Sequence, residues 1–244
     1  MLVFTNYMKY KTIHLSSVDS TNKYIKEHYK ELDSFTFVST DYQSAGKGRN
    51  NRVWLANKGD NLLFSLLVKD ESIIKDGPII SLITAVSVAE VLEKYNLSKV
   101  QIKWPNDIYV NDKKIVGILL EGMIPRFLVI GVGINVNQKL FEGEYRKEPT
   151  SLFLELGEEI NINELKEDVY NALFNNLIHY SSSHDLFLKY FKKHDFLHNK
   201  DVRFVFNNNI LTGVVKGIDE DFNIVIQGED KEYHISSGEI ELLK

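Results

Sequence analysis

The stretch VQIKWPNDIYVNDKKIVGILLEGMIPRFLVIGVGINVN, residues 100–137, alternates apolar and β-branched runs with short turn segments. The runs have the composition and length of β-strands. Asn111-Asp112 is a dipeptide typical of a tight hairpin, and residues 123–126 form a second short connection. Because strands joined by such short turns pair antiparallel, this stretch predicts the centre of a largely antiparallel sheet.

The flanking sequence supplies further strands and the helices that cover them. Strands are expected at 11–18, 35–43 and 61–68, and apolar residues at helical spacing predict a buried helix over 78–96. Helical patterns return over 150–157, 163–182 and 185–194, and short strands follow Asn199. The predicted class is therefore α+β: a mixed, largely antiparallel sheet packed with helices over 1–197, and a small C-terminal β-barrel over 198–244.

Composition limits the range of functions. The chain has 244 residues, of which 43% are hydrophobic, and a formal net charge of -5, which argues against general nucleic-acid binding. It has no cysteine, which excludes disulfides, cysteine-ligated zinc and a thioester to the enzyme. The first residues lack a signal-peptide pattern, and no run approaches a membrane span, so we expect a cytoplasmic protein without membrane contact.

A basic glycine loop, QSAGKGRNNRVW, occupies residues 43–54. It fits neither a P-loop, which needs Ser or Thr after the lysine, nor G-x-G-x-x-G, because Asn51 stands at the third glycine position. Its glycines permit movement and its three cations suit a small anionic ligand. A solvated basic loop is the alternative interpretation of this segment taken alone.

Three other stretches carry polar groups at the ends of predicted strands. KWPND places Lys103 where its ammonium can point into a pocket, although a lysine snorkelling from a strand end would look the same. Gly131 and Gly133 lie on one strand face, where a flat ligand, close packing or a bulge would each fit, and Asn135 follows them. DSTN, residues 19–22, reads by itself as a helix cap.

Together, in this order and spacing, the four stretches resemble the biotin protein ligases. The most specific part is KWPND followed by KKIVGILLE at 113–121, and the resemblance runs from about residue 12 into the terminal barrel. It implies a catalytic domain of the biotin and lipoate ligase type, similar to class II aminoacyl-tRNA synthetases, with a Src-homology-3-like C-terminal domain. It also implies two steps: biotin and ATP give biotinyl-5'-AMP, and biotin then passes to a lysine of a carboxyl-carrier domain.

The resemblance assigns roles to individual residues. Catalysis falls to Lys103, which would bridge the biotin carboxylate and the α-phosphate, and to Arg49. The implied biotin-binding set is Ser20, Thr21, Asn22, Gln43, Lys47, Gly48, Arg49 and Lys103. The implied ATP and adenylate set is Arg49, Arg52, Trp54, Lys103, Lys114 and Asn135. Mg²⁺ is expected with ATP, and no residue is predicted as its ligand.

This sequence departs from the common G-R-G-R-x-G-R form of the loop at two positions. Lys47 replaces an arginine and loses its bidentate fork, and Asn51 replaces a glycine, a change that asparagine's tolerance of positive φ makes acceptable. Only about ten residues precede the first strand, so we expect a form without the N-terminal DNA-binding domain of some relatives, and hence no specific DNA binding.

Two rival functions stay open, a lipoate-type ligase and a catalytically silent biotin or nucleotide sensor. A homodimer is expected if a strand such as 126–136 presents a sheet edge, and burial of that strand by helices is the alternative.

Overall fold

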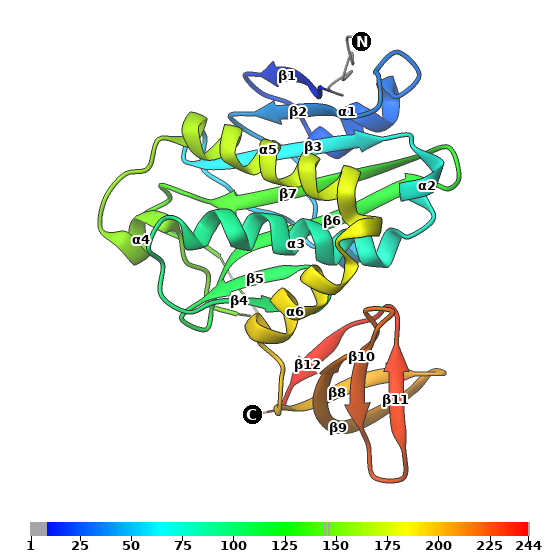
Figure 1. Cartoon of the computed structure of the whole chain (residues 1–244). Coiled ribbons are helices and arrows are strands. Elements are labelled where there is room, and N and C mark those ends of the chain that lie inside the picture. The colour runs from blue at the N-terminus through cyan, green and yellow to red at the C-terminus, as the bar shows by residue number, and fades with distance from the viewer. Residues whose placement is uncertain (1–8, 144, 146, 244) are drawn as a thin grey trace, which may run out of the picture.

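A seven-stranded sheet forms the centre of the protein in the computed structural model, which describes residues 9–143, 145 and 147–243. The strand order is β1-β2-β3-β7-β6-β5-β4 (Figure 1). Among these seven described strands, β1 and β2 are the one parallel pair, so the sheet is mixed and largely antiparallel, as predicted. The strands are β1 Lys11–Leu15, β2 Thr36–Thr40, β3 Asn61–Val68, β4 Val100–Lys103, β5 Asp107–Val110, β6 Lys113–Met123 and β7 Phe127–Asn135.

The hairpins of the central stretch form where the turn residues indicate. Asn111 and Asp112 both have positive φ, 50° and 65°, which is the backbone that a two-residue hairpin between β5 and β6 requires. The strand expected over 126–136 is confirmed as β7, but it is not a sheet edge. It pairs with β3 on one side and β6 on the other, so the edge pairing suggested for a dimer is wrong for this strand.

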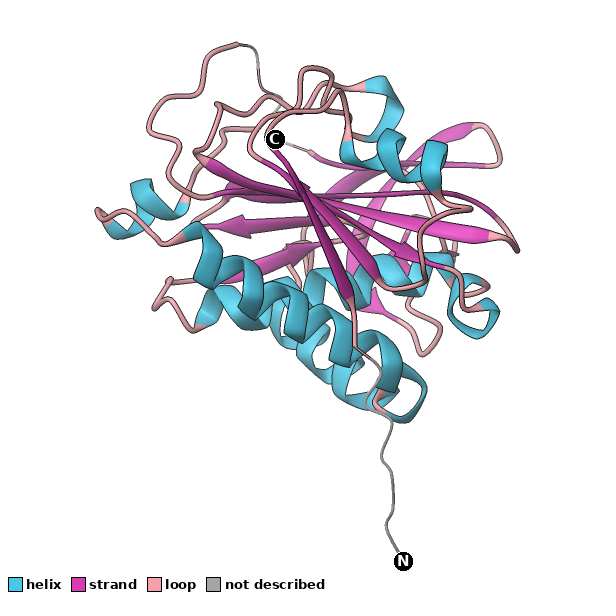
Figure 2. Cartoon of the chain, turned by 90° about the horizontal axis from the view of Figure 1, so that it is seen from above, coloured by secondary structure: helices cyan, strands magenta, loops and turns pink. Residues whose placement is uncertain are grey.

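Helices pack on both faces of the sheet (Figures 1 and 2). The long helices α3, Gly77–Glu93, and α5, Ile162–His179, cover one face, and α6, His184–His194, continues toward the C-terminal domain. Helix α1, Thr21–His28, contacts β2, β3 and β7 from the other face. The short helices are α2 Glu71–Ile74, α4 Leu152–Leu156, η1 Arg49–Asn51 and η2 Tyr180–Ser182.

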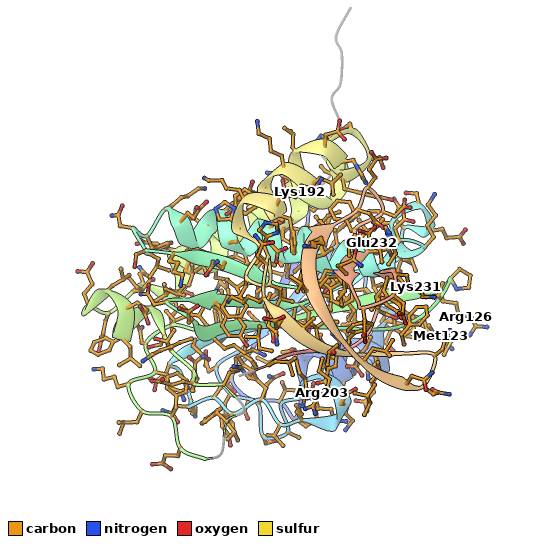
Figure 3. All side chains as sticks on the ribbon, turned by 90° about the horizontal axis from the view of Figure 1, so that it is seen from below. Met123, Arg126, Lys192, Arg203, Lys231 and Glu232 are labelled. Atoms are coloured by element: carbon orange, nitrogen blue, oxygen red, sulfur yellow. The ribbon has the colours of Figure 1, made fainter. Side chains whose placement is uncertain are left out.

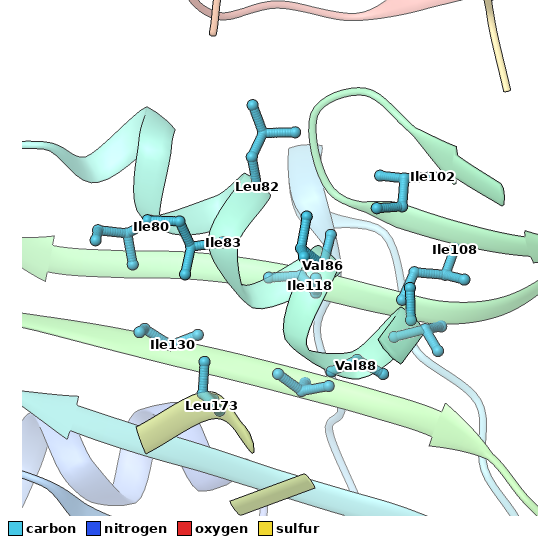
Figure 4. Close-up of a cluster of buried hydrophobic side chains, with 14 of the residues drawn as sticks. Ile80, Leu82, Ile83, Val86, Val88, Ile102, Ile108, Ile118, Ile130 and Leu173 are labelled. Carbon is cyan, nitrogen blue, oxygen red and sulfur yellow. The ribbon is translucent and has the colours of Figure 1, made fainter. Parts of the chain in front are cut away.

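Branched aliphatic side chains fill the space between α3 and the sheet (Figure 4). Ile83 and Val86 of α3 lie with Ile118 of β6 and Ile130 of β7, and all are fully or nearly fully buried. Such a layer of β-branched residues is stiff and close-packed, and each fully buried side chain contributes about 2 kcal/mol to stability. The helices therefore hold one face of the sheet rigid and leave cavity formation to the other face.

A second, five-stranded antiparallel sheet follows α6 and is called here the C-terminal domain. Its strands are β8 Asp201–Phe206, β9 Asn209–Ile218, β10 Ile224–Gln227, β11 Glu232–Ile235 and β12 Ile240–Leu242. In the view from below, Arg203 and Glu232 lie on these strands, and Met123 and Arg126 mark the turn between β6 and β7 (Figure 3). The predicted α+β class with a small C-terminal β-domain is confirmed.

The C-terminal domain is attached to the seven-stranded sheet beside the KWPND turn. The indole Nε1 of Trp104 donates to the carbonyl oxygen of Phe222 at 3.1 Å, and Trp104 is 2% exposed.

No helix in the described part of the chain is long and apolar enough to cross a lipid bilayer. The expectation of no signal peptide rests on the first residues of the sequence, and residues 1–8 lie outside the described ones.

Candidate active site

A cavity of about 760 Å³ lies between the helix α1 side of the sheet, the 43–54 loop and the C-terminal domain. Residues from the four motifs converge there, although they are far apart in the sequence. The residues predicted for the site all line this cavity: Ser20, Thr21, Asn22, Gln43, Lys47, Gly48, Arg49, Arg52, Trp54, Lys103, Lys114 and Asn135. The solvated-loop interpretation of 43–54 is therefore less favoured than a ligand site.

The 43–54 loop folds as a tight hairpin-like turn. Gly48 N donates to Arg52 O at 2.7 Å, and Trp54 N donates to Gly46 O at 2.9 Å. Asn50 has a positive φ of 55°. From the family pattern, in which a glycine is common at position 51, positive φ was expected at Asn51 instead. The turn keeps its left-handed residue one position earlier, and asparagine is one of the few non-glycine residues that adopt this conformation readily.

Both loop arginines contact the C-terminal domain. Arg49 donates from Nη1 to Asn106 Oδ1 and from Nη2 to Gly238 O, each at 3.0 Å. Arg52 forms an ion pair with Glu239. The loop is therefore held over the cavity from two directions, by the KWPND turn and by the segment before β12.

The three middle residues of KWPND, Trp104, Pro105 and Asn106, each make a distinct contact. Trp104 fastens the C-terminal domain, and the carbonyl oxygen of Pro105 accepts from Ser81 Oγ of α3 at 2.9 Å. Asn106 donates from Nδ2 to Ile118 O at 2.8 Å while its Oδ1 accepts from Arg49. These contacts fix the turn rigidly, so the strand-end Lys103 faces the cavity.

Lys103 lies near two carboxylates, Asp107 and Glu239, and two ammonium groups, Lys114 and Lys147. Burial lowers the pKa of Lys103; the Asp107 carboxylate opposes this shift, and the Lys114 ammonium adds to it. Lys114 Nζ lies 2.7 Å from Asp107 Oδ1, so the two form a partly buried ion pair. A desolvated cation beside a second cation is stabilised by any anion that enters, which suits a site for a carboxylate and a phosphate.

The other end of the cavity carries uncharged polar groups. Thr21 N donates to Gln43 Oε1 at 2.8 Å, and Ser65 Oγ lies 2.6 Å from both Thr21 Oγ1 and Asn22 Oδ1. The cap expected from DSTN is wrong in one respect, because Ser20 at the N-cap makes no side-chain capping bond. The Thr21 and Asn22 side chains bond instead to residues beside the cavity.

Two glycines expected to leave room for a flat ligand instead accommodate side chains of the protein. A Cβ added at Gly131 would lie 2.3 Å from Asn22 Oδ1, and one at Gly133 would lie 2.5 Å from Trp54 Cε2. The Trp54 indole also covers Gly117, the register partner of Gly133 on β6. The Trp54 indole therefore packs with one face on these glycines, and the other face of the indole is left for a ligand.

Asn135 ends β7 with one polar atom open. Its Nδ2 donates to Thr150 O at 2.9 Å, whereas its buried Oδ1 has no hydrogen-bond partner among the described residues. Lys114 Nζ lies 5.6 Å from the centroid of the Trp54 ring nearby. An acceptor beside an indole is a suitable place for the amino edge of a flat nitrogen heterocycle.

Two contributions were missed from the sequence. Ser65 is a fully buried hydroxyl within the apolar strand NLLFSLLV, and that isolated polar residue was the available signal. Gly238 and Glu239 carry no local signal, because only the packing of the C-terminal domain brings them to Arg49 and Arg52.

Comparisons with known proteins agree with this geometry. Residues 15–137 match the biotin/lipoate A/B protein ligase family, and residues 197–243 match the biotin protein ligase C terminal domain. The chain is 30% identical over 238 residues to the bifunctional ligase/repressor BirA of Escherichia coli, covering 93% of this chain and 73% of that protein. It is 32% identical over 127 residues to the biotin-[acetyl-CoA-carboxylase] ligase of Paracoccus denitrificans, 50% of this chain and 52% of that one.

A solved structure is similar over nearly the whole chain. The biotin protein ligase from Aquifex aeolicus in complex with biotin and ATP superposes with a TM-score of 0.87 at 29% identity, covering 96% of this chain and 99% of that one.

Proposed function

Because the chain belongs to the biotin/lipoate A/B protein ligase family, we propose that it is an ATP-dependent biotin protein ligase. The observation that carries the proposal is one cavity with uncharged polar groups at one end and Lys103, Arg49 and Arg52 at the other. Biotin has a neutral ureido ring, an aliphatic chain and a carboxylate, and ATP adds a triphosphate. The cavity offers matching groups for each part.

The first step joins two anions. A biotin carboxylate oxygen attacks the α-phosphorus of ATP, and pyrophosphate leaves, which gives biotinyl-5'-AMP. Negative charges repel strongly in a buried site, so fixed cations are needed to bring them together and to stabilise the developing charge. We assign the bridging role to Lys103, with Arg49 as the second catalytic cation closing over the carboxylate and phosphate.

The remaining assignments follow from where each side chain lies in the cavity. Arg52 would leave its ion pair with Glu239 and bind the triphosphate, and Lys114 would assist Arg52 in binding the triphosphate. The open face of Trp54 would stack on adenine, with Asn135 Oδ1 accepting from its amino group. The proposed biotin set stays as Ser20, Thr21, Asn22, Gln43, Lys47, Gly48, Arg49 and Lys103, all of which line the cavity.

Mg²⁺ is proposed to enter with the nucleotide. The described residues contain no group of three or more His, Cys, Asp or Glu placed to hold a metal ion. The cavity is lined by Asp107, Glu239 and Glu241, and Mg²⁺ commonly takes one or two carboxylates together with phosphate oxygens and water. When bound, it would neutralise charge on the leaving pyrophosphate.

In the second step the amine of an acceptor lysine attacks the acyl carbon and AMP leaves. We propose that the acceptor is a biotin carboxyl-carrier domain of a carboxylase. Sequence-specific DNA binding is not proposed, and the net charge of -5 supports that view. A homodimer and a domain boundary between residues 197 and 198 remain predictions.

The test is biotin transfer to a purified carrier domain, followed by intact-mass measurement. Incubation with ATP, Mg²⁺ and biotin should add one biotinyl group to one lysine, and omission of ATP should abolish the gain. A gain with lipoate in place of biotin would identify a lipoate-type ligase. Binding of biotin without any mass gain would identify a silent sensor.

A further inference from the structure

Glu121 lies near the last residues of β6, behind the uncharged end of the cavity, and contacts α1 through both carboxylate oxygens. Oε1 lies 2.6 Å from Lys26 Nζ, and Oε2 accepts from Asn22 Nδ2 at 2.8 Å. Asn22 and Lys26 are one helical turn apart, so both side chains leave the same face of α1. The Glu121 side chain is 27% exposed, which places this charge largely out of water.

The Glu121 carboxylate is the nearer of two acceptors that set which way the Asn22 amide points; Asn22 Nδ2 also donates to Leu119 O, at 3.4 Å. Burial raises the pKa of Glu121, but the hydrogen bonds from Lys26 and Asn22 outweigh burial, and the pKa lies below its ordinary value. An ionised carboxylate can only accept, so Asn22 must present Nδ2 to it. The Asn22 Oδ1 is then directed toward Ser65, whose hydroxyl lies 2.6 Å away.

The orientation passes through Ser65 to Thr21. Ser65 has a single hydroxyl hydrogen for two contacts of 2.6 Å, to Asn22 Oδ1 and to Thr21 Oγ1. Because Asn22 Oδ1 cannot donate, Ser65 donates its hydrogen to it. The hydroxyl hydrogen of Thr21 is then used within the protein, between Ser65 Oγ at 2.6 Å and Gln43 Oε1 at 3.1 Å. Thr21 Oγ1 therefore keeps only lone pairs for a ligand.

Gln43 supplies the complementary group. Its Oε1 accepts from Thr21 N at 2.8 Å and from Thr21 Oγ1 at 3.1 Å. Its Nε2 makes no hydrogen bond to the described residues and is therefore a donor for a ligand. An acceptor at Thr21 and a donor at Gln43 match the N–H and C=O of a cyclic urea. A dithiolane ring has neither group, so it would leave both unpaired, and unpaired buried polar groups are costly.

We propose that Glu121 is a positioning residue that sets the hydrogen-bond direction of the Asn22, Ser65 and Thr21 chain, and thereby selects a cyclic urea over a dithiolane. The assignment rests on the proposed function for the identity of the acid, and it concerns binding rather than the reacting atoms. Glu121 would act through Asn22 without touching the substrate.

The test compares biotin and lipoate binding by calorimetry, with pyrophosphate release measured in parallel. Glu121→Met removes the acceptor and should weaken biotin binding about tenfold while leaving lipoate binding unchanged. Glu121→Gln keeps an acceptor and should restore most of the loss. Glu27→Met removes a carboxylate that pairs with Lys23 on the exposed part of α1 and serves as the matched control.

Exchanging the amide of Asn22 and the carboxylate of Glu121 distinguishes a positioning role of Glu121 from a merely structural one. Asn22→Asp should weaken biotin binding because two carboxylates then face each other, and Asn22→Asp/Glu121→Gln should recover it by reversing the hydrogen bond. Unchanged biotin affinity in Glu121→Met, or no recovery in the exchanged pair, would overturn the proposal. Wild-type protein that binds biotin but releases no pyrophosphate would refute the ligase function, while the affinity comparison would still decide the role of Glu121.

Discussion

Arg49 and Asn106 are joined by a hydrogen bond of 3.0 Å, from Nη1 to Oδ1, across 57 positions of sequence. Asn106 is itself fixed to β6 through its Nδ2 and its backbone carbonyl, which bond to Ile118 O and Ile118 N. The KWPND turn therefore provides a rigid docking point for the 43–54 loop as well as the lysine that faces the cavity.

Loss of this docking point should make the site retain its intermediate less well. Asn106→Ala frees Arg49 on one side, so we expect about tenfold more biotinyl-5'-AMP to escape into solution per pyrophosphate released. Asn106→Asp keeps an acceptor for Arg49 but loses the Nδ2 donor to Ile118 O, so it should retain more adenylate than Asn106→Ala and less than wild type. Chromatography of free adenylate measures the effect, and equal escape from all three proteins would show that Asn106 does not hold the loop.

Lys103 should be essential for the first step but not for folding. Lys103→Ala removes the cation between the carboxylate and the α-phosphate, and a loss of about 100-fold or more in pyrophosphate release is expected. Its thermal stability should not fall, because the buried ammonium is desolvated in the folded state. A variant within about threefold of wild type would remove Lys103 from its catalytic role.

The packing of Trp54 on Gly133 gives a third test, which concerns ATP binding. Gly133→Ala places a methyl group 2.5 Å from Trp54 Cε2, so the indole must shift and the adenine site should be distorted. We expect the KM for ATP to rise about tenfold with little change for biotin. Gly77→Ala, where an added Cβ meets no atom within 4 Å, is the control. Equal KM values for ATP in wild type and Gly133→Ala would contradict this placement.

The buried Asp195, which follows α6, predicts a pH-dependent stability. Burial raises its pKa to about 6 from 3.8, opposed by the Leu197 backbone N–H. A raised carboxyl pKa contributes stability that is fully present below 3.8 and is lost as pH rises through about 6.

Asp195→Asn keeps the neutral form at every pH. Relative to wild type it should therefore gain up to about 3 kcal/mol at neutral and higher pH and little at acidic pH. Thermal melts of both proteins at about pH 4 and about pH 8 measure this. The same Tm difference at both values would show that Asp195 does not titrate in this range.

Local sequence predicts the elements of this fold well where turn residues and periodicity are strong. Asn111-Asp112 marked the β5–β6 hairpin, and NLLFSLLV matched β3 residue for residue. Local sequence could not show that β7 is an interior strand, because strand order depends on contacts between distant segments.

For the site, too, the sequence predicted individual residues but not the contacts between distant segments. The resemblance located residues that do line one cavity, such as Lys103 and Trp54, but not what occupies the space above each glycine. Trp54 rather than a ligand lies on Gly133, and Glu239 reaches Arg52 only because two domains pack together. Positive φ was expected at Asn51 but occurs at Asn50. The sequence could not distinguish the two positions, because both are asparagine.

The most direct test of the central claim is pyrophosphate release from ATP and Mg²⁺ with biotin or lipoate as the acid. The account predicts release that depends on biotin, is absent with lipoate and is lost in Lys103→Ala. Release with lipoate but not with biotin, or biotin-dependent release that Lys103→Ala leaves intact, would contradict it.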